Sequence, residues 1–206
     1  MDITGTSHSF YGNSRVLLEG AIIELTARLD LMRSWWVANG ERDPISYVIS
    51  RVKSEDSMRE KLRRRGLPVT LEAALNEIND GAGVRVVCSY INDVYRIAEQ
   101  IRNLSGVTIV CEKDYIQAPK PNGYRSYHTN LVLDLDVMGT VHKVNAEIQI
   151  RTIAMDCWAS LEHQLKYKHN VKNQSVIVDE LRRCADEMAT TDLNMQTIRD
   201  MIRAQN

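Results

Sequence analysis

Two alternating segments near the centre of the chain most restrict what it can fold into. Residues 130–137 and 143–152 each place apolar side chains at every second position, which is the period of a β-strand. In the second segment the polar residues face the opposite way, and the residues expected to point inward are Val144, Ala146, Ile148 and Ile150. Met138-Gly139 between the two segments predicts a hairpin or a short loop. The chain should therefore contain a sheet with one buried face and one polar face.

Other helical and strand-like segments surround this hairpin. Apolar residues at helical spacing predict a first helix over residues 16–37, which Asn39-Gly40 and Pro44 end. Further strands are predicted at 46–53, 83–89 and 107–116. Further helices are predicted at 55–65, 70–78, 93–104, 153–168 and, as one helix or two, 176–203. This order predicts an α+β fold, with a mixed or antiparallel sheet of about five strands surrounded by helices and helical extensions at both ends.

Length and composition argue against several classes of protein. A chain of 206 residues is most simply one domain, and a net charge of −1 argues against a dedicated nucleic-acid binder. The four cysteines are scattered without a C-x-x-C pair, so a zinc ribbon or a thioredoxin-type site is not expected. Residues 1–13 do not resemble a secretory signal, and no apolar run approaches the ~20 residues of a membrane span. A cytoplasmic protein without a membrane partner is therefore expected.

The loop at residues 119–128 carries the side chains most typical of a nucleotide site. Gly123 can adopt a positive φ, and Tyr124 after it should stand on the exposed face of the loop. A base stacked on such a ring gains ~1–3 kcal/mol in single-stranded nucleic-acid systems. Cations for phosphate groups are supplied by Lys113, Lys120, Arg125 and His128. The alternative is a surface loop in which Tyr124 only packs on the sheet.

Glu147 is an acidic residue within an otherwise apolar strand. Alternation places it on the polar face together with Gln149 and Arg151. Other predicted strands add cations to the sheet, namely Arg51, Lys53 and Arg85. A face with several cations and few acids favours an anionic ligand such as a nucleotide. The alternative is a solvated strand face on which Glu147 pairs with Arg151.

Asp80 precedes the flexible turn Gly81-Ala-Gly83 and the strand that follows it. A carboxylate there can reach into a cleft and bind Mg²⁺, which uses one or two carboxylates besides the phosphates of a substrate. Asp80 and Glu147 would suffice if the fold brought them together. The alternative is a carboxylate that serves only an Asn-Asp-Gly turn. Lys61 and the arginines at 63–65 form a basic cluster on a helix, and a solvated surface is its simplest interpretation.

Together these residues resemble the single-domain small alarmone synthetases of the RelA/SpoT homologue family. The similar segments lie in the same order between residues 44 and 168, and they are Ser50-Arg-Val-Lys53, Asp80-Gly-Ala-Gly-Val-Arg85, Asp114-Tyr-Ile116, Asn122-Gly-Tyr-Arg-Ser-Tyr-His128, Glu147-Ile-Gln-Ile-Arg-Thr152, Ala154-Met-Asp-Cys-Trp-Ala159 and Leu161-Glu-His163. The resemblance implies a nucleotidyltransferase-like sheet. It also implies a synthetase domain at 44–168, a helical extension at 1–43, C-terminal helices at 169–206 and a homotetramer.

The activity that this resemblance implies is a pyrophosphokinase. The β,γ-diphosphate of ATP would move to the ribose 3′-hydroxyl of GDP or GTP, giving ppGpp or pppGpp and AMP. By position, Arg51 and Arg85 would flank the adenine of ATP, and Lys53 and Lys61 would hold its phosphates. Asp80 would bind Mg²⁺ as part of the catalytic machinery.

The resemblance also implies an acceptor site. Tyr124 would stack on guanine, and Asn122 would read its edge. The remaining acceptor contacts would come from Lys120 and His128 on the phosphates and from Gln149, which would orient the nucleotide. Glu147 would activate the 3′-hydroxyl and would also be able to touch the metal. A ribose hydroxyl is a poor nucleophile until a base accepts its proton, a contribution of typically ~10²–10⁴-fold.

Two features of the chain differ from longer or more typical family members. It has no His-Asp dyad of a hydrolase domain, so no alarmone hydrolysis is expected, and Gly81 stands where isoleucine is common.

One alternative function keeps the chemistry but changes the acceptor to the 3′ end of tRNA or to an adenine nucleotide. Another is a catalytically silent nucleotide-sensing or RNA-binding module. The net charge of −1 disfavours RNA as a partner.

Overall fold

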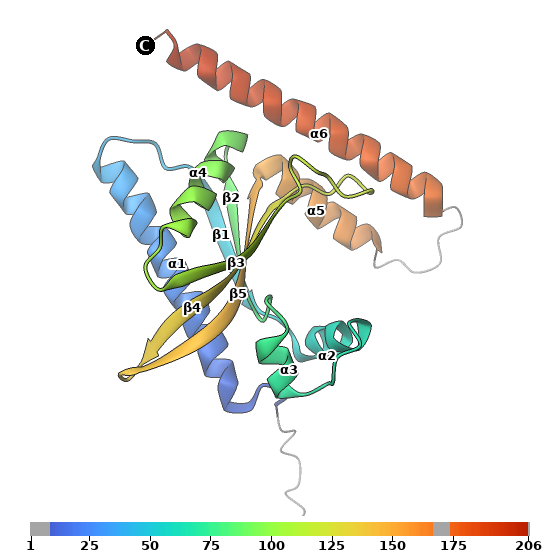
Figure 1. Ribbon diagram of the computed structural model, residues 1–206. Helices are drawn as coiled ribbons and strands as arrows, with labels where there is room; N and C mark the ends of the chain where they lie inside the picture. Colours follow the sequence, from blue (N-terminus) through green and yellow to red (C-terminus); the bar gives the residue numbers. More distant parts are fainter. Residues whose placement is uncertain (1–8, 167–173, 206) are drawn as a thin grey trace, which may run out of the picture.

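The computed structural model describes residues 9–166 and 174–205. Its centre is a five-stranded sheet in the order β1-β2-β5-β4-β3 (Figure 1). β2 and β5 pair in parallel, whereas the other neighbouring strands pair antiparallel. The strands are β1 (Ile45–Val52), β2 (Ala82–Cys88), β3 (Val107–Asp114), β4 (Tyr127–Val137) and β5 (Thr140–Thr152). The prediction of an α+β fold with about five strands is confirmed, and the sheet is mixed.

The β4–β5 hairpin fixes the register at the centre of the sheet. Val137 pairs with Thr140, which leaves a two-residue turn. In that turn Met138 has a φ of 54° and Gly139 a φ of 82°, a conformation whose twist matches that of the strands it joins. The Asp136 side chain accepts a hydrogen bond from the Gly139 amide at 2.8 Å. The hairpin predicted at this position is confirmed.

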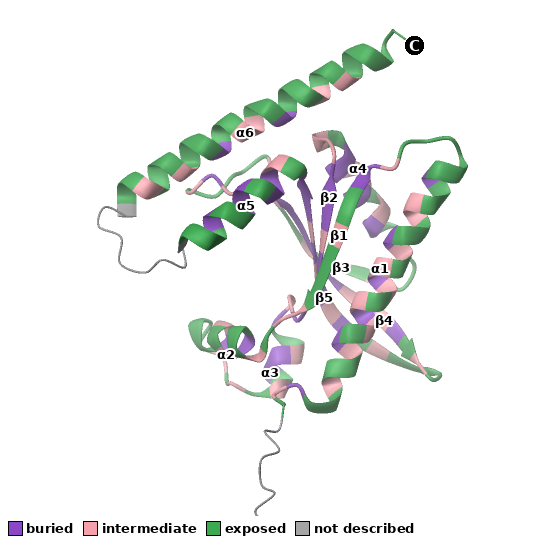
Figure 2. Ribbon diagram, turned by 180° about the vertical axis from the view of Figure 1, so that it is seen from behind, coloured by how far each residue is buried: buried purple, intermediate pink, exposed green. Residues whose placement is uncertain are grey.

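One face of the sheet is buried under two helices, α1 (Arg15–Ala38) and α4 (Ile91–Arg102). The residues of β5 expected to point inward are all buried there (Figure 2). Leu18, Leu25 and Leu29 of α1 complete the same core. Burial of each such side chain contributes roughly 1.5–3 kcal/mol. The first helix is thus part of the core of the sheet, while the domain boundary at residue 43 stays a prediction.

Two short helices, α2 (Glu55–Arg64) and α3 (Leu71–Asn76), pack together beyond one end of the sheet (Figure 1). Each begins at a hydroxyl cap: Ser54 Oγ accepts from the Ser57 amide, and Thr70 Oγ1 accepts from the Ala73 amide. Such caps satisfy helix amides that would otherwise lack a partner. A short 3₁₀ helix, η1 (Gly12–Ser14), precedes α1.

The C-terminal helices lie at the other end of the sheet. α5 (Ile153–Lys166) starts where β5 ends, and Thr152 Oγ1 accepts a hydrogen bond from the Met155 amide at 3.2 Å. α6 (Gln174–Arg203) is a single helix that packs against α5 (Figure 1). The predicted boundary at residue 168 lies outside the described residues. Within the described ranges, no helix combines the length and the apolar character needed to cross a membrane.

Candidate active site

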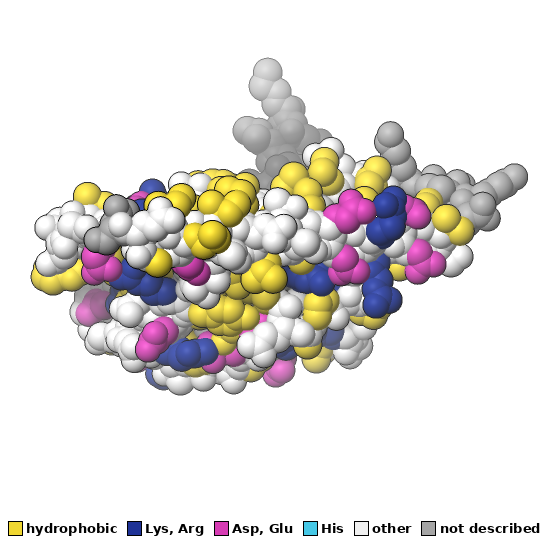
Figure 3. Space-filling model, turned by 90° about the horizontal axis from the view of Figure 1, so that it is seen from above, with side chains coloured by type: hydrophobic (Ala, Val, Ile, Leu, Met, Phe, Trp, Pro, Cys, Tyr) yellow, Lys and Arg dark blue, Asp and Glu magenta, His cyan; other side chains and the backbone are white. Residues whose placement is uncertain are grey.

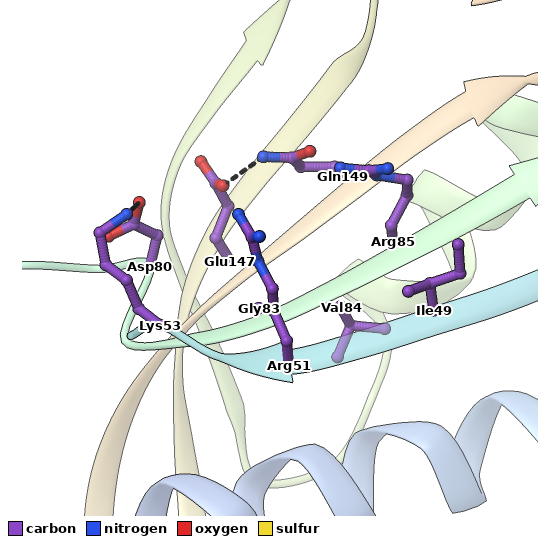
Figure 4. Close-up of a pocket in the computed structure, with 9 residues that line it drawn as sticks. All are labelled: Ile49, Arg51, Lys53, Asp80, Gly83, Val84, Arg85, Glu147 and Gln149. Atoms are coloured by element: carbon purple, nitrogen blue, oxygen red, sulfur yellow. Dashed lines mark hydrogen bonds and ion pairs between the residues drawn. The ribbon is translucent and has the colours of Figure 1, made fainter. Parts of the chain in front are cut away.

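The second face of the sheet carries polar side chains, and the strand register aligns them in two rows. In one row Arg51 lies beside Gly83, Gly83 beside Glu147, and Glu147 beside Asn130. The next row runs, in order, through Arg85, Gln149, His128 and Lys113. Figure 4 shows Arg51, Arg85 and Glu147 on one side of their strands, whereas Val84 points to the other. Segments that are far apart in the sequence therefore form one polar surface.

Glu147 lies at the centre of this surface. His128 Nδ1 is 3.2 Å from one carboxylate oxygen, and Gln149 Nε2 donates to the other at 2.7 Å. Burial by itself raises the pKa of Glu147, but the hydrogen bonds from His128 and Gln149 and the charges of His128 and Lys61 together lower it to about 2. The carboxylate is thus ionised throughout the physiological pH range. The alternative of an ion pair with Arg151 is wrong, because Arg151 pairs with a different acid.

Asp80 lies in the turn that leads into β2. Its Oδ2 is 3.0 Å from Lys53 Nζ and 2.7 Å from Lys61 Nζ. Its Oδ1 is buried and has no hydrogen-bond partner among the described residues. A carboxylate oxygen in that state suits a hard cation. Lys61 therefore lines the site and does not belong to a solvated surface. Arg63 and Arg64 are exposed, as the simplest interpretation expected, whereas Arg65 is exposed and also lines the cavity that contains Lys61.

A cavity of about 150 Å³ lies over β1 and β2, and we call it the arginine cavity (Figure 4). Its walls include Arg51, Arg85 and Ile49, with Gly83 between the two arginines. A Cβ on Gly83 would meet only the Arg51 carbonyl oxygen, at 3.6 Å, so glycine there leaves space above the strand. Burial lowers the pKa of Arg85, and the neighbouring charge of Arg151 lowers it further. Flat guanidinium groups on both sides of an open slot suit a planar ring.

A second cavity, of about 410 Å³, lies over β5, β4 and the loop before β4, and we call it the tyrosine cavity. Tyr124 and Asn122 line it, together with Lys120, His128 and Lys61. Lys120 Nζ is 4.6 Å from the centroid of the Tyr124 ring. The cavity combines an aromatic ring with several cations, which suits a purine that carries phosphates.

Tyr124 is half-buried, so the expectation that it stands on the exposed face of its loop is corrected. Its ring packs edge-on against Tyr115, His128 and Trp158. Its hydroxyl lies 2.8 Å from His128 Nε2 and accepts from Arg151 Nη2 at 2.8 Å. The protein thus holds the ring in place from several sides, although the ring still lines the tyrosine cavity.

The two cavities share three residues, Asp80, Glu147 and Gln149. Asp80 and Glu147 therefore meet in one site, as the sequence interpretation required. Every residue to which the family resemblance gave a role lines one cavity or the other. Their individual roles stay predictions. Arg125, also considered as a cation for phosphates, lines neither of them and pairs with Asp186 of α6.

Residues 50–172 match the family described as the region found in RelA and SpoT proteins. This chain belongs to the RelA/SpoT family. It is 39% identical to GTP pyrophosphokinase YwaC of Bacillus subtilis over 186 residues, which cover 90% of this chain and 89% of the relative. It is 32% identical to GTP pyrophosphokinase YjbM of the same organism over 183 residues, which cover 89% of this chain and 85% of the relative.

Solved structures of the family have the same fold. Small alarmone synthetase 1 of Bacillus subtilis bound to its product pppGpp superposes with a TM-score of 0.83 at 31% identity, covering 92% of this chain and 95% of that one. Small alarmone synthetase 2 of that organism gives a TM-score of 0.81 at 39% identity, covering 92% and 97%. The resemblance to small alarmone synthetases drawn from the sequence motifs is confirmed.

In this family member, sequence reasoning gave no role to the buried carboxylate of Asp156. Asp156 of α5 pairs with Arg85 at 3.1 Å and with Arg151 at 2.9 Å, and it accepts from the Tyr47 hydroxyl at 3.0 Å. Arg151 in turn donates to Tyr124 of the tyrosine cavity. Asp156 is thus linked to an arginine of one cavity and, through Arg151, to the ring of the other.

Sequence reasoning also missed Glu162 of α5, whose carboxylate accepts from Asn122 Nδ2 at 3.0 Å. The helical spacing of the sequence after residue 153 could have identified both acids as candidates. Asp156 and Glu162 fall on the same face as Met155, Trp158 and Ala159, and the structure buries all of them. Charges on an apolar helix face need partners, which marks them as candidates for a site.

Proposed function

We propose that this RelA/SpoT family member is a pyrophosphokinase that transfers the β,γ-diphosphate of ATP to the ribose 3′-hydroxyl of GDP or GTP. The observation that carries the proposal is the pair of cavities that share Asp80, Glu147 and Gln149. A diphosphate transfer needs two nucleotides whose reacting groups meet, and the shared wall provides that place. The relatives YwaC and YjbM are named GTP pyrophosphokinases, which agrees with this assignment. A structural neighbour was solved with AMPCPP and another with pppGpp.

ATP occupies the arginine cavity in this proposal. Its adenine lies between Arg51 and Arg85, and its phosphates extend toward Lys53 and Lys61. Both lysines pair with Asp80 in the structure. Phosphate oxygens offer these ammonium groups further charge-assisted hydrogen bonds, so both lysines bond to the phosphates when ATP binds.

GDP or GTP occupies the tyrosine cavity. The guanine stacks on Tyr124, Asn122 reads its edge, and Lys120 and His128 contact its phosphates. Gln149 orients the ribose toward Glu147. Since stacking accepts any base, the choice of base depends on hydrogen bonds at its edge.

Glu147 accepts the proton of the 3′-hydroxyl. Its low pKa makes it a weak base while His128 and Gln149 both bond to it. When substrates draw His128 toward phosphate, Glu147 loses part of the stabilisation of its charge, and its proton affinity rises. Ionised Glu147 would also be able to supply an oxygen ligand to Mg²⁺.

Asp80 and Glu147 are the residues that would hold Mg²⁺. The buried Asp80 Oδ1, which has no hydrogen-bond partner among the described residues, fits a cation. Mg²⁺ typically uses one or two carboxylates and takes further ligands from the phosphates of a substrate. When bound, the ion neutralises charge on the transferred diphosphate.

We further propose that the protein acts as a homo-oligomer, a tetramer by resemblance, in the cytoplasm, where its nucleotide substrates are found. Exposed apolar side chains on α1 and α6 support the oligomer. They include Ile23 and Trp35 on α1 and Met195, Ile198 and Ile202 on α6.

Purified protein incubated with Mg²⁺, labelled ATP and one acceptor at a time tests the assignment. The acceptors are GDP, GTP, ATP and deacylated tRNA, and the products are separated by chromatography. We expect AMP together with ppGpp or pppGpp. Label on tRNA or on an adenine nucleotide would identify the alternative acceptors, and binding without AMP would identify a silent module.

The Glu147→Gln variant tests the mechanism. It removes the carboxylate but keeps the size of the side chain, so nucleotide binding should persist while AMP production is abolished. A variant as active as the parent protein would contradict the role of Glu147.

A further inference from the structure

Asn122 lies at the tip of the loop that carries Tyr124, and both side chains line the tyrosine cavity. The two ends of the Asn122 amide have different partners. The Tyr124 backbone N–H donates to Asn122 Oδ1 at 3.3 Å, and Asn122 Nδ2 donates to Glu162 Oε1 at 3.0 Å. Glu162 comes from α5 and is 7% exposed. The amide is therefore held between its own loop and a buried acid from another element.

These partners permit only one orientation of the amide. A backbone N–H can only donate, and an ionised carboxylate can only accept. If the amide were turned over, two donors would face each other at Tyr124 and two acceptors at Glu162. A buried polar group without a partner is costly, so the turned orientation is disfavoured. The assignment of the two amide ends thus follows from the chemistry of their partners.

The fixed orientation has a consequence for the base that binds. An amide nitrogen carries two hydrogens, and among the described residues Asn122 Nδ2 makes a single hydrogen bond, to Glu162. Its second N–H is available to a ligand in the tyrosine cavity. Position 6 of guanine is a carbonyl oxygen, which accepts, whereas position 6 of adenine is an amino group, which donates. An amide held in the donor orientation donates a hydrogen bond to the carbonyl oxygen of guanine and repels the amino group of adenine.

We infer that Glu162 determines the base specificity of the acceptor site by locking Asn122 as a hydrogen-bond donor. The inference rests on the proposed function for the assignment of the tyrosine cavity to the acceptor. Glu162 also lines the tyrosine cavity, but in this inference it acts through its hydrogen bond with Asn122, so it is a positioning residue. A purely structural role, in which Glu162 only joins α5 to the loop, predicts equal losses with every acceptor.

The Glu162→Gln variant separates these roles, because glutamine has nearly the same shape but can donate as well as accept. In the variant, the turned orientation of Asn122, which presents its oxygen to the base, is opposed only by the mismatch at the Tyr124 N–H and no longer also by a mismatch at position 162. The measurement is kcat/KM with GDP, inosine diphosphate and ADP as acceptors, by transfer of label from saturating ATP. Inosine diphosphate keeps the 6-carbonyl and lacks the 2-amino group. We expect the preference for GDP over ADP, and for inosine diphosphate over ADP, to fall by about 10-fold or more.

Ratios within one variant do not depend on how much of the protein is folded, so a partly unfolded variant still gives a result. Glu187→Gln is the matched control, since Glu187 is an exposed acid of α6 paired only with Arg183 in the described residues. It should leave all ratios unchanged. If Glu162→Gln lowers activity equally with the three acceptors, the inference is overturned and Glu162 is structural.

Failure of the proposed function gives a different result. In that case the parent protein transfers no label to GDP, and displacement of a fluorescent GDP analogue by GDP, inosine diphosphate and ADP replaces the assay. A smaller preference for the 6-carbonyl nucleotides in Glu162→Gln still supports the inference, and an unchanged preference overturns it.

Discussion

At the scale of single residues, Asp156 shows how a buried charge organises the site. It is 5% exposed and lies between Arg85 and Arg151, two cations that would repel each other without it. Arg151 is itself buried and also donates to Gln149 Oε1 at 3.0 Å. One carboxylate on α5 therefore holds Arg85, which lines the arginine cavity, and Arg151, which donates to Gln149 and Tyr124 in the tyrosine cavity. Its removal should affect folding and binding together.

The Asp156→Asn variant leaves the buried guanidinium of Arg151 and the half-buried one of Arg85 without an anionic partner at this position. Breaking a buried ion pair by removing one charge costs about 3 kcal/mol or more. For a chain of this size, that corresponds to a fall in Tm of roughly 6–12 °C, which thermal unfolding measures. The KM values for both nucleotides should rise as well.

Glu180→Gln provides the control for that variant. Glu180 pairs with Arg183 on the surface of α6, where both side chains are more than half exposed. Such a pair contributes ~0–1 kcal/mol, so its loss should barely change Tm. Equal effects of the two variants would contradict the organising role of Asp156.

At the scale of elements, α6 packs against the loop that carries Asn122 and Tyr124. Gly123 has a φ of 90°, and a Cβ there would lie 2.6 Å from Ala185 Cβ and 3.1 Å from Arg182 Cα. Arg125 of the loop also pairs with Asp186 of α6 at 2.9 Å. The helix thus sets how far the loop can move away from the sheet.

The Gly123→Ala variant should weaken acceptor binding and lower stability, because it combines an unfavourable φ with a steric clash against α6. The backbone contributes about 1–2 kcal/mol and the clash typically about 1–3 kcal/mol more. Gly139→Ala is the matched control. Gly139 has a φ of 82° but nothing within 4 Å of its Cβ position. Thermal unfolding and the acceptor KM of both variants measure the difference, and equal losses would show that contact with α6 is unimportant.

α6 is also tied to the end of β5, where the Thr152 hydroxyl donates to the buried carboxylate of Asp192. Burial raises the pKa of Asp192 above 3.8, and the bond from Thr152 opposes this only in part. The folded state therefore binds the proton more tightly than the unfolded state does. The stabilisation that results is complete below about pH 3.8 and is lost as pH rises through the raised pKa.

The Asp192→Asn variant removes this titration. Relative to the parent protein, its free energy of unfolding should increase as pH rises from about 4 to 7. Urea unfolding at several pH values measures the difference between the two proteins. Only the variation of this free-energy difference with pH tests the assignment, because its pH-independent part also contains the free-energy cost of placing the new amide. A difference that does not vary with pH, or that falls, would contradict the assignment.

At the scale of the whole molecule, α6 leaves apolar side chains in contact with solvent. Met195, Ile198 and Ile202 lie at helical spacing and are each about half exposed. Figure 3, which views the molecule from above, shows hydrophobic side chains along this part of the surface. A face of this kind is typical of contacts between copies of a chain.

Light scattering after size-exclusion chromatography should give a mass that is a multiple of 23.5 kDa. Ile198→Glu places a charge on the exposed face of α6 and should lower the mass. Val141→Glu is the control, because Val141 is 60% exposed on the β4–β5 hairpin, away from α6. A monomeric parent protein, or equal masses for all three, would contradict an oligomer built on α6.

The sequence alone determined which face of each strand a residue takes and where the helices begin. Alternation is a local property, so it placed Glu147 and Gln149 on the polar face and Ile148 in the core. The caps at Ser54 and Thr70 are also local, since each side chain bonds an amide within three residues. Asp80 and Glu147 were identified by their residue types and by family resemblance.

Only the tertiary structure decided which strands are neighbours. The parallel pairing of β2 with β5 puts Gly83 beside Glu147, and no local pattern encodes it. The half-burial of Tyr124 and the partners of Asp156 and Glu162 likewise depend on α5 and α6 returning to the sheet. Side-chain periodicity specifies a direction from the backbone, whereas the partner met in that direction depends on long-range packing of the whole chain.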